Sequence, residues 1–249
     1  MVVKRLLDMN VIITGCNRGI GKAFVQTFAK SGANIWACAR KATFEYEEWL
    51  QQTAEESGVW IKPVYFELTD KEELNVGIQS IIDEGQPIDV LINNAGISTV
   101  ALLSMSKVED MEELFNVNYF AMLRIIQKVS KRMARQRYGV IINMGSIAGI
   151  EPQPGKIAYG SSKAAVMMMT KCLAKELGPM GIRVNAIAPG PIETEMIHQY
   201  KDEMLEKLAA ESALRRLGKK EEIAQVALFL ASGQASYING EIIKVDGGR

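Results

Sequence analysis

A tyrosine and a lysine four residues apart are the residues whose types and spacing most directly suggest chemistry. Tyr159 and Lys163 lie in a segment of helical periodicity, so both side chains project from one face of the expected helix. A phenol titrates near pH ~10, and a nearby ammonium lowers its pKa toward the range useful for proton transfer. Interconversion of a carbonyl and an alcohol needs such a group. A core tyrosine beside a solvated lysine has the same spacing, so the pair gains meaning only from its context.

The residues after the first apolar run form a glycine-rich turn. Residues 11–21 read VIITGCNRGIG and place three glycines between a buried strand and an amphipathic helix. Such glycines allow a tight turn and a close approach of the backbone to a pyrophosphate, while the helix N-terminus attracts the anion. An ordinary βα turn can also hold three glycines, but the position after the first strand favours a nucleotide. The expected cofactor contacts here are Gly15, Asn17, Arg18, Gly19, Ile20 and Gly21.

The end of the second expected strand indicates which nucleotide binds. NAD enzymes usually carry an acidic residue there for the ribose hydroxyls, whereas this chain has Ala39 followed by Arg40. The Arg40 guanidinium matches a 2′-phosphate, and Arg18 could bracket the same group. The alternative is that both arginines are solvated surface charges. The missing acid and the two cations together predict NADP(H).

Short apolar runs alternate with longer segments of helical periodicity along the whole chain. This alternation is typical of repeated βαβ units around a parallel sheet. The expected strands are residues 10–14, 35–39, 59–67, 88–93, 140–144, 183–188 and 241–245, and the expected helices begin near Ile20, Thr43, Lys71, Lys107, Lys156, Glu193 and Lys220. No repeat or linker marks a domain boundary. The pattern predicts one α/β domain over residues 1–249, a Rossmann-like, doubly wound parallel sheet of about seven strands with helices on both faces.

Polar residues at the strand ends supply the context for the tyrosine and the lysine. Asn93 and the three residues after it close the fourth strand, and Ser146 closes the fifth, where open parallel sheets bind ligands. Asn118 and the Pro189-Gly190 turn after the sixth strand complete an ordered set of motifs with the glycine loop. With these motifs the chain resembles the short-chain dehydrogenase/reductase family, in its compact single-domain branch, over essentially its whole length.

The resemblance implies a role for each matching residue. Tyr159 is the expected proton donor in reduction, Ser146 hydrogen-bonds the substrate carbonyl, and Lys163 binds the nicotinamide ribose and lowers the tyrosine pKa. Asn118 holds a water that links Lys163 to solvent, and the cofactor supplies the hydride. Glu67, followed by Leu68, stands where the family commonly has an aspartate that contacts adenine. The other expected cofactor contacts are Asn94, Ala95 and Gly96 along the adenosine and ribose, and Pro189, Gly190, Ile192 and Thr194 at the nicotinamide end.

Taken singly, these residues also have structural explanations. Asn118 could cap or kink its helix, Ser146 could end a strand, and Pro189-Gly190 could be only a turn. An NADPH-sensing protein without turnover is a further alternative, but it has no chemical need for all four catalytic residues. The expected activity is therefore that of an NAD(P)-dependent oxidoreductase acting on CH–OH groups.

Within this family the chain looks similar to the bacterial 3-oxoacyl-acyl-carrier-protein reductases. Arg18 before Gly19, residues 192–196 (IETEM) and residues 245–248 (VDGG) carry that similarity. It implies reduction of a 3-oxoacyl thioester. Met180, however, stands where those reductases tend to carry a second basic residue, so a small ketone, a sugar or another secondary alcohol stays open as the substrate. An acidic acyl carrier protein could dock on a basic segment, although a solvated helix face explains its charges equally well: Lys128, Lys131, Arg132, Arg135 and Arg137.

A lid and an oligomer are also expected. Residues 191–217 follow the Pro189-Gly190 turn, are rich in Glu, Lys and Met, and have no strand pattern, so they are expected to close over cofactor and substrate. By family resemblance we expect a homotetramer, built partly from the helices that begin near Lys107 and Lys156. The apolar residues 166–169 (VMMM) support this weakly, because packing on the sheet would bury them as well.

Charge and cysteine usage exclude several partners. The chain has 29 Lys plus Arg and 29 Asp plus Glu, so no net positive field attracts nucleic acid or an anionic membrane. Cys16, Cys38 and Cys172 are widely spaced and fit neither a disulfide framework nor a zinc site. The lone His198 has no cysteine or second histidine nearby, so we expect a surface or lid residue and no metal. No signal-peptide core or membrane-length apolar stretch is found, and the expected location is the cytoplasm.

Overall fold

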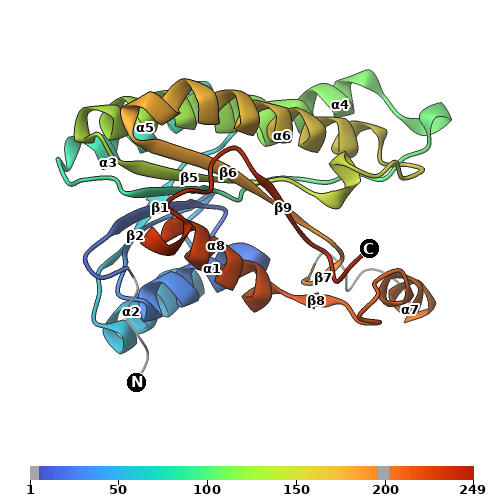
Figure 1. Cartoon of the computed structure of the whole chain (residues 1–249), viewed down its shortest axis with the longest axis horizontal. Helices are drawn as coiled ribbons and strands as arrows, with labels where there is room; N and C mark the ends of the chain where they lie inside the picture. The colour runs from blue at the N-terminus through green and yellow to red at the C-terminus, as the bar shows by residue number, and fades with distance from the viewer. Residues whose placement is uncertain (1–5, 196–201) are drawn as a thin grey trace.

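A seven-stranded parallel sheet forms the centre of the molecule (Figure 1). The computed structural model describes residues 6–195 and 202–249, and its strands lie in the order β3-β2-β1-β4-β5-β6-β9. Their bounds are β1 (Asn10–Thr14), β2 (Asn34–Ala39), β3 (Ile61–Tyr65), β4 (Val90–Asn93), β5 (Gly139–Met144), β6 (Ile182–Pro189) and β9 (Ile242–Val245). Every pairing in this sheet is parallel, so all carboxyl ends meet at one edge. The predicted doubly wound sheet is confirmed.

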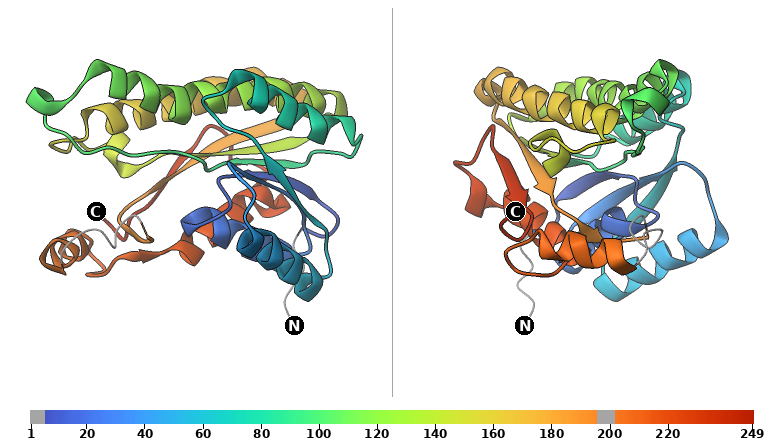
Figure 2. Two further views of the ribbon diagram at one scale, coloured as in Figure 1. Left: turned by 180° about the vertical axis from the view of Figure 1, so that it is seen from behind. Right: turned by 90° about the vertical axis from the view of Figure 1, so that its right-hand side faces the viewer.

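Helices cover both faces of this sheet, and the three layers are visible in both orientations of Figure 2. One face carries α1 (Gly19–Lys30), α2 (Phe44–Ser57) and α8 (Lys220–Ala231). The other face carries α3 (Lys71–Asp83), α4 (Val108–Phe115), α5 (Met122–Gln136) and α6 (Ile157–Leu177). Both sides of the sheet are therefore buried, which is the arrangement that the alternating pattern predicts.

Strand residues alternate between two hydrophobic cores, one under each helical layer. Ile12 and Trp36 belong to the core under α3, α5 and α6, whereas Ile13 and Ala37 belong to the core under α1 and α8. Successive strand side chains point to opposite faces, so a strand covered on both sides is apolar throughout. All five residues of β1 are buried for this reason. Each buried large aliphatic side chain contributes about 1.5–3 kcal/mol, which makes the sheet a firm platform for its polar edge.

Two of the expected helices differ from the prediction. The helix expected from Lys107 consists of α4, a π-helical turn η2 (Asn116–Ala121) and α5 in direct succession. Turns of this kind are frequent at functional sites. The helix expected near Glu193 is wrong, because Ile192–Glu193 form a short strand β7 that pairs with β8 (Gly218–Lys219). The buried Ile192 side chain packs into the core under α1 and α8, and the next helix, α7 (Asp202–Ala210), begins later.

Short turns complete the fold: η1 (Leu103–Met105), η3 (Ile147–Gly149), η4 (Gly178–Met180) and η5 (Gly233–Ala235). Within the described ranges, no helix has both the length and the apolar character needed to cross a membrane. His198 and part of the expected lid lie outside the described residues.

Candidate active site

The strand register brings the predicted site residues to one edge of the sheet. β4 and β5 are in register at Asn93 and Asn143, and β5 and β6 are in register at Met144 and Ile187. The segments that follow β4 and β5, including Ser146, therefore leave the sheet at neighbouring positions. The strand order reverses between β1 and β4, and this is the point at which open α/β sheets bind ligands.

The turn η3 and the start of α6 pack backbone against backbone. A Cβ on Gly160 would lie 2.5 Å from the Ala148 carbonyl oxygen, so only glycine permits this approach. The Ser146 hydroxyl caps η3 by accepting a hydrogen bond from the Ala148 N–H at 3.2 Å. The Ser146 side chain also lies close enough to the Tyr159 phenol to act on its pKa. The two residues expected to contact a substrate carbonyl thus meet.

The phenol of Tyr159 is protonated at neutral pH. Burial raises the pKa of Tyr159, and the hydrogen bond with Ser146 acts in the opposite direction without reversing the shift. The prediction that Lys163 lowers the pKa of Tyr159 is therefore wrong for the protein without bound ligands. Carbonyl reduction nevertheless needs the protonated form, because the phenol must give a proton to the forming alcohol.

Lys163 lies beside the phenol and is itself buried. Its side chain is 4% exposed, its Nζ donates to the Met144 carbonyl oxygen at 2.8 Å, and it lies 5.8 Å from the centre of the Tyr159 ring. Burial lowers the pKa of Lys163 to about 8. An amine with this pKa is still mostly charged at neutral pH, so the phenol pKa stays high because burial of the phenol itself outweighs the attraction of the ammonium.

Asn118 lies in the π turn and fastens the segment that follows β4. Its side chain is fully buried, donates to the Ile97 carbonyl oxygen and accepts from the Ile97 N–H, both at 2.9 Å. It also donates to Ser162 Oγ at 3.1 Å, and that hydroxyl donates to the Tyr159 carbonyl oxygen at 2.8 Å. Ser162 was not predicted, although it immediately precedes Lys163. Ser162 fixes the orientation of the Asn118 amide, because the Ser162 hydroxyl already donates its proton to Tyr159 and can only accept from Asn118.

The glycine loop is held by two side chains at the ends of β1 and β4. Thr14 Oγ1 accepts from the N–H groups of Asn94 and Ala95, both at 3.1 Å. Asn94 Nδ2 in turn donates to the carbonyl oxygens of Thr14 and Gly15, at 2.9 and 3.0 Å. Asn94 was expected along the adenosine path, and its amide also shapes the glycine loop. Thr14 was not predicted as a site residue.

The start of α1 fits the pyrophosphate of a nucleotide. Arg18 precedes the helix without a side-chain cap, and no acidic residue lies in the first turn, so N–H groups of that turn can receive an anion. Gly19 has a φ of 53°, which favours glycine. A Cβ at Gly19 would lie 3.5 Å from Glu195 Oε2 and 3.7 Å from Thr194 Cγ2. Thr194, expected at the nicotinamide end, is therefore placed over the phosphate loop.

The residues expected around the adenosine lie at the ends of β2 and β3. Arg40 is exposed, and its Nε lies 3.8 Å from Glu67 Oε2. Such an exposed pair contributes little stability, so the guanidinium can turn toward a phosphate. The Glu67 carboxylate also accepts from the Thr69 N–H at 3.3 Å. The Leu68 side chain is partly buried and packs against the core under α3.

The turn after β6 is fixed by the last strand. Gly190 N–H donates to the Val245 carbonyl oxygen at 3.0 Å, and a Cβ on Gly190 would lie 2.8 Å from the Asp246 Cα. Ile192 is 6% exposed and packs in the core, which leaves its backbone as the part that can face a ligand. Pro189 and Gly190 thus lie at the expected carboxyl edge.

Lys156 is a second ammonium beside the phenol and was not among the predicted site residues. Its Nζ lies 5.3 Å from the centre of the Tyr159 ring and donates to Ser98 Oγ at 3.2 Å. The spacing of one helical turn before Tyr159 is a signal that could have identified it.

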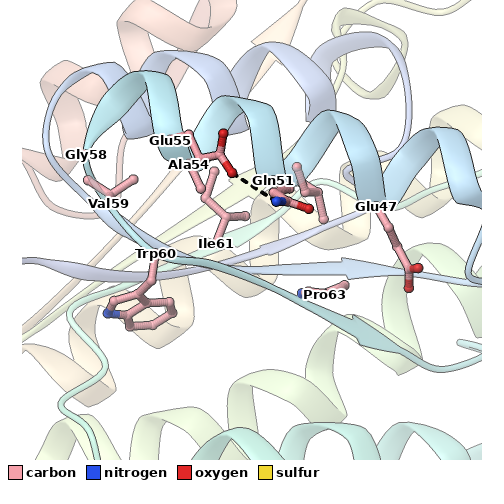
Figure 3. A pocket seen from close by; sticks show the side chains of 10 residues that line it. Glu47, Gln51, Ala54, Glu55, Gly58, Val59, Trp60, Ile61 and Pro63 are labelled. Carbon is pink, nitrogen blue, oxygen red and sulfur yellow. Dashed lines mark hydrogen bonds between the residues drawn. The ribbon is translucent and has the colours of Figure 1, made fainter.

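A surface hollow of about 540 Å³ lies away from this edge, between α2 and β3 (Figure 3). Its polar lining consists of Glu47, Gln51 and Glu55, together with backbone atoms. Gln51 Nε2 already donates to Glu55 Oε1 at 2.9 Å. Since the lining holds no cation that could receive a phosphate, the hollow offers no counterpart to the nucleotide site expected at the carboxyl edge.

The chain is similar to proteins of known sequence and structure over nearly its full length. The sequence profile of a family described as enoyl-(acyl carrier protein) reductase matches residues 15–249. A 3-oxoacyl-[acyl-carrier-protein] reductase from Thermotoga maritima is 41% identical over 244 residues, covering 98% of each chain.

Solved structures agree with these sequence similarities. A crystal structure from Agrobacterium tumefaciens, proposed to be a gluconate dehydrogenase, has a TM-score of 0.93 at 28% identity and covers 99% of this chain and 98% of that one. A 3-oxoacyl-[acyl-carrier protein] reductase from Brucella melitensis, solved with bound NAD, has a TM-score of 0.87 at 30% identity, with coverage of 99% and 93%.

Proposed function

Because this chain belongs to the short-chain dehydrogenase/reductase family, whose members are nicotinamide-dependent oxidoreductases acting on CH–OH groups and ketones, we propose that it reduces a carbonyl with Tyr159 as proton donor. The observation that carries this proposal is the close packing of η3 on the start of α6, which brings Ser146 to Tyr159 at the carboxyl edge, with Lys163 beside them. The protonated phenol suits the direction of reduction.

Each catalytic residue has one task in this proposal. A bound reduced nicotinamide supplies the hydride for the carbonyl carbon. The Ser146 hydroxyl donates to the carbonyl oxygen and holds it at the phenol, and Tyr159 gives that oxygen its proton as the alcohol forms. The Lys163 ammonium binds the nicotinamide ribose and stabilises the tyrosinate that remains. Asn118 positions the segment after β4 and, by family resemblance, holds a water toward Lys163.

NADP(H) is the proposed form of the cofactor. Arg40 follows the buried Ala39, and no acidic residue of β2 stands where the ribose hydroxyls of NAD would be bound. Arg18 and Arg40 are both exposed, and the weak pairing of Arg40 with Glu67 leaves its guanidinium able to turn toward a 2′-phosphate. The NAD bound to the Brucella melitensis reductase makes direct titration of both cofactors the necessary check. The residues proposed to hold the cofactor are Gly15, Asn17, Arg18, Gly19, Ile20, Gly21, Arg40, Glu67, Leu68, Asn94, Ala95, Gly96, Tyr159, Lys163, Pro189, Gly190, Ile192 and Thr194.

The proposed substrate is a 3-oxoacyl thioester, which becomes a 3-hydroxyacyl product. The support is the 3-oxoacyl-[acyl-carrier-protein] reductase of Thermotoga maritima, with which the chain shares 41% of its residues over 244 positions. The test is NADPH oxidation with acetoacetyl thioesters on carrier protein and on coenzyme A, beside small ketones and keto-sugars. Turnover of a keto-sugar or sugar acid without thioester turnover would favour the alternative represented by the Agrobacterium tumefaciens structure.

An acyl carrier protein is the proposed macromolecular partner, and α5 offers the matching charge. Lys131, Arg135 and Arg137 are exposed at the end of α5, whereas Arg132 is folded back and donates to the Gly85 carbonyl oxygen. The exposed cations can attract an acidic partner. Charge reversal at Lys131 and Arg135 should raise KM for the carrier-linked thioester but not for a small ketone. The control is Lys30→Glu, which reverses an exposed charge on α1 at the opposite face of the sheet. Equal effects on both substrates would remove the docking proposal.

Residues 191–217 are the proposed lid, and two anchors limit which part of it can move. β7 pairs with β8 at one end. At the other end, Ser212 Oγ donates to the Gly247 carbonyl oxygen at 3.0 Å, and Arg249 Nη1 lies 2.7 Å from Glu211 Oε2. Of the described residues between these anchors, α7 is the part proposed to move.

A homotetramer is the proposed assembly. Apolar side chains on the outer side of the α4 to α6 layer are exposed, among them Val108 at 64% and Met168 at 61%. The neighbours of Met168 in the run 166–169 are buried, so that run contributes one side chain to an outer surface. Light scattering that gives a concentration-independent monomer would contradict this proposal.

A further inference from the structure

Lys156 joins the start of α6 to the segment after β4, beside the reacting phenol. It is the residue immediately before α6, one helical turn ahead of Tyr159, with its Nζ 5.3 Å from the centre of that ring. The same Nζ donates to the Ser98 hydroxyl at 3.2 Å. Ser98 directly follows Ile97, which Asn118 fastens by two hydrogen bonds. The Lys156 ammonium is therefore held at the edge where Ser146 meets Tyr159.

This ammonium has spare hydrogen-bonding capacity and no anion of its own. Among the ion pairs that join residues within 6–195 and 202–249, none includes Lys156. The side chain is half-buried, and burial lowers the pKa of Lys156 because water solvates its charged form poorly. A lysine has three N–H donors, and the Ser98 hydroxyl accepts only one. Such a group gains free energy from another oxygen acceptor, and most from a charged one.

We propose that Lys156 is a substrate-binding residue that donates to an oxygen on C1 of a 3-oxo substrate, while Ser146 and Tyr159 contact the oxygen on C3. This inference rests on the proposed 3-oxoacyl function and narrows it to substrates with two oxygens on carbons separated by one methylene group. A thioester carbonyl and a free carboxylate both place an oxygen on C1. A simple ketone has no such oxygen, so Lys156 gives it no advantage.

The test compares three substrates that share the reacting ketone. Acetoacetyl-coenzyme A carries a neutral C1 oxygen, acetoacetate carries a charged one, and butan-2-one carries none. Lys156→Met retains the apolar stem and removes the donor, and Lys156→Arg restores a cation. Lys175→Met, an exposed lysine at the far end of α6, is the matched control. NADPH affinity, measured by fluorescence titration, verifies that each variant is folded and loaded.

We expect kcat/KM of Lys156→Met to fall by about tenfold or more for the oxygenated substrate that wild type uses, because a hydrogen bond to a charged group is lost. The value for butan-2-one should stay within about twofold, and Lys156→Arg should recover part of the loss. An equal fall for butan-2-one would overturn the inference, since Lys156 would then act on the phenol and not on C1. An unchanged preference for the oxygenated substrate would overturn it as well.

The two proposals fail in different ways in this experiment. If wild type reduces acetoacetate but no thioester, the proposed thioester function is wrong while the role of Lys156 is still tested on the acid. If wild type reduces the thioester and Lys156→Met keeps its selectivity, the function stands and the role of Lys156 is wrong. If wild type prefers butan-2-one to both, both proposals are contradicted.

Discussion

The side chain of Asn118 holds the backbone of Ile97 at both its polar groups, donating to the carbonyl oxygen and accepting from the N–H at 2.9 Å each. Asn118 comes from the π turn between α4 and α5, and Ile97 from the segment after β4. A buried amide that forms a pair of bonds in this way fixes the path of an otherwise irregular segment. Ser98, the partner of Lys156, is the next residue along that path.

Asn118→Ala should loosen this segment and lower turnover. The substitution removes both hydrogen bonds to the partly buried Ile97 N–H and carbonyl, and each such bond contributes roughly 0.5–1.5 kcal/mol. We expect the free energy of unfolding in urea to fall by about 2 kcal/mol or more, with a loss of kcat/KM. Asn116→Ala, at an exposed position of the same turn, should change both quantities little. Similar behaviour of the two variants would contradict the role assigned to Asn118.

Arg40→Ala should weaken NADPH binding and leave NADH binding nearly unchanged, because only NADPH carries the 2′-phosphate. Loss of a charge-assisted hydrogen bond predicts about a tenfold or greater rise in the NADPH dissociation constant. Lys41→Ala removes the neighbouring exposed cation and is the control for general electrostatics. Wild type is titrated with both cofactors in the same series, and a preference for NADH would show that the interpretation of Ala39 and Arg40 is wrong.

The buried ammonium of Lys163 should make stability depend on pH. Its pKa is about 8 in the folded protein and 10.5 for an ordinary lysine, so between these values the unfolded chain binds a proton that the folded chain does not. The free energy of unfolding should therefore rise with pH across this window, by up to roughly 3 kcal/mol. Lys163→Met removes this dependence, so its stability relative to wild type should decline from neutral to alkaline pH. The free energy of unfolding is measured by urea denaturation at neutral and at alkaline pH. A difference between wild type and Lys163→Met that is the same at both pH values would contradict the burial of a titrating amine.

Cofactor binding should slow hydrogen exchange in α7 more than at the lid anchors. The proposed closure moves α7, whereas the β7–β8 pairing and the Ser212 contact to Gly247 are formed already. Exchange followed by mass spectrometry with and without NADPH should show new protection in residues 202–210. Equal protection there in both states would indicate a fixed helix instead of a lid.

The sequence predicts the elements that carry a local pattern and misses features that arise only from tertiary contact. Seven apolar runs become the seven strands, and the spacing of Tyr159 and Lys163 places both on one helix. β7 is missed because two residues give no periodicity. The bond between Lys156 and Ser98 is missed because the residues are 58 positions apart.

The pKa shifts of Tyr159 and Lys163 were predicted less well than the positions of these residues. The sequence indicates a cation near the Tyr159 phenol, and the structure confirms one within 5.8 Å of the ring. The sign of the pKa shift depends on how deeply both groups are buried, and periodicity does not report depth. Burial raises the pKa of the phenol and lowers that of the lysine, so desolvation outweighs their attraction.

The most direct test of the central claim is the rate of NADPH-dependent carbonyl reduction by Tyr159→Phe, with NADPH affinity measured on the same preparation. Only the phenolic hydroxyl is removed, and loss of a general acid predicts a fall in kcat of at least about 100-fold with an unchanged NADPH dissociation constant. Turnover that stays near the wild-type rate in a folded, NADPH-binding variant would contradict Tyr159 as the proton donor.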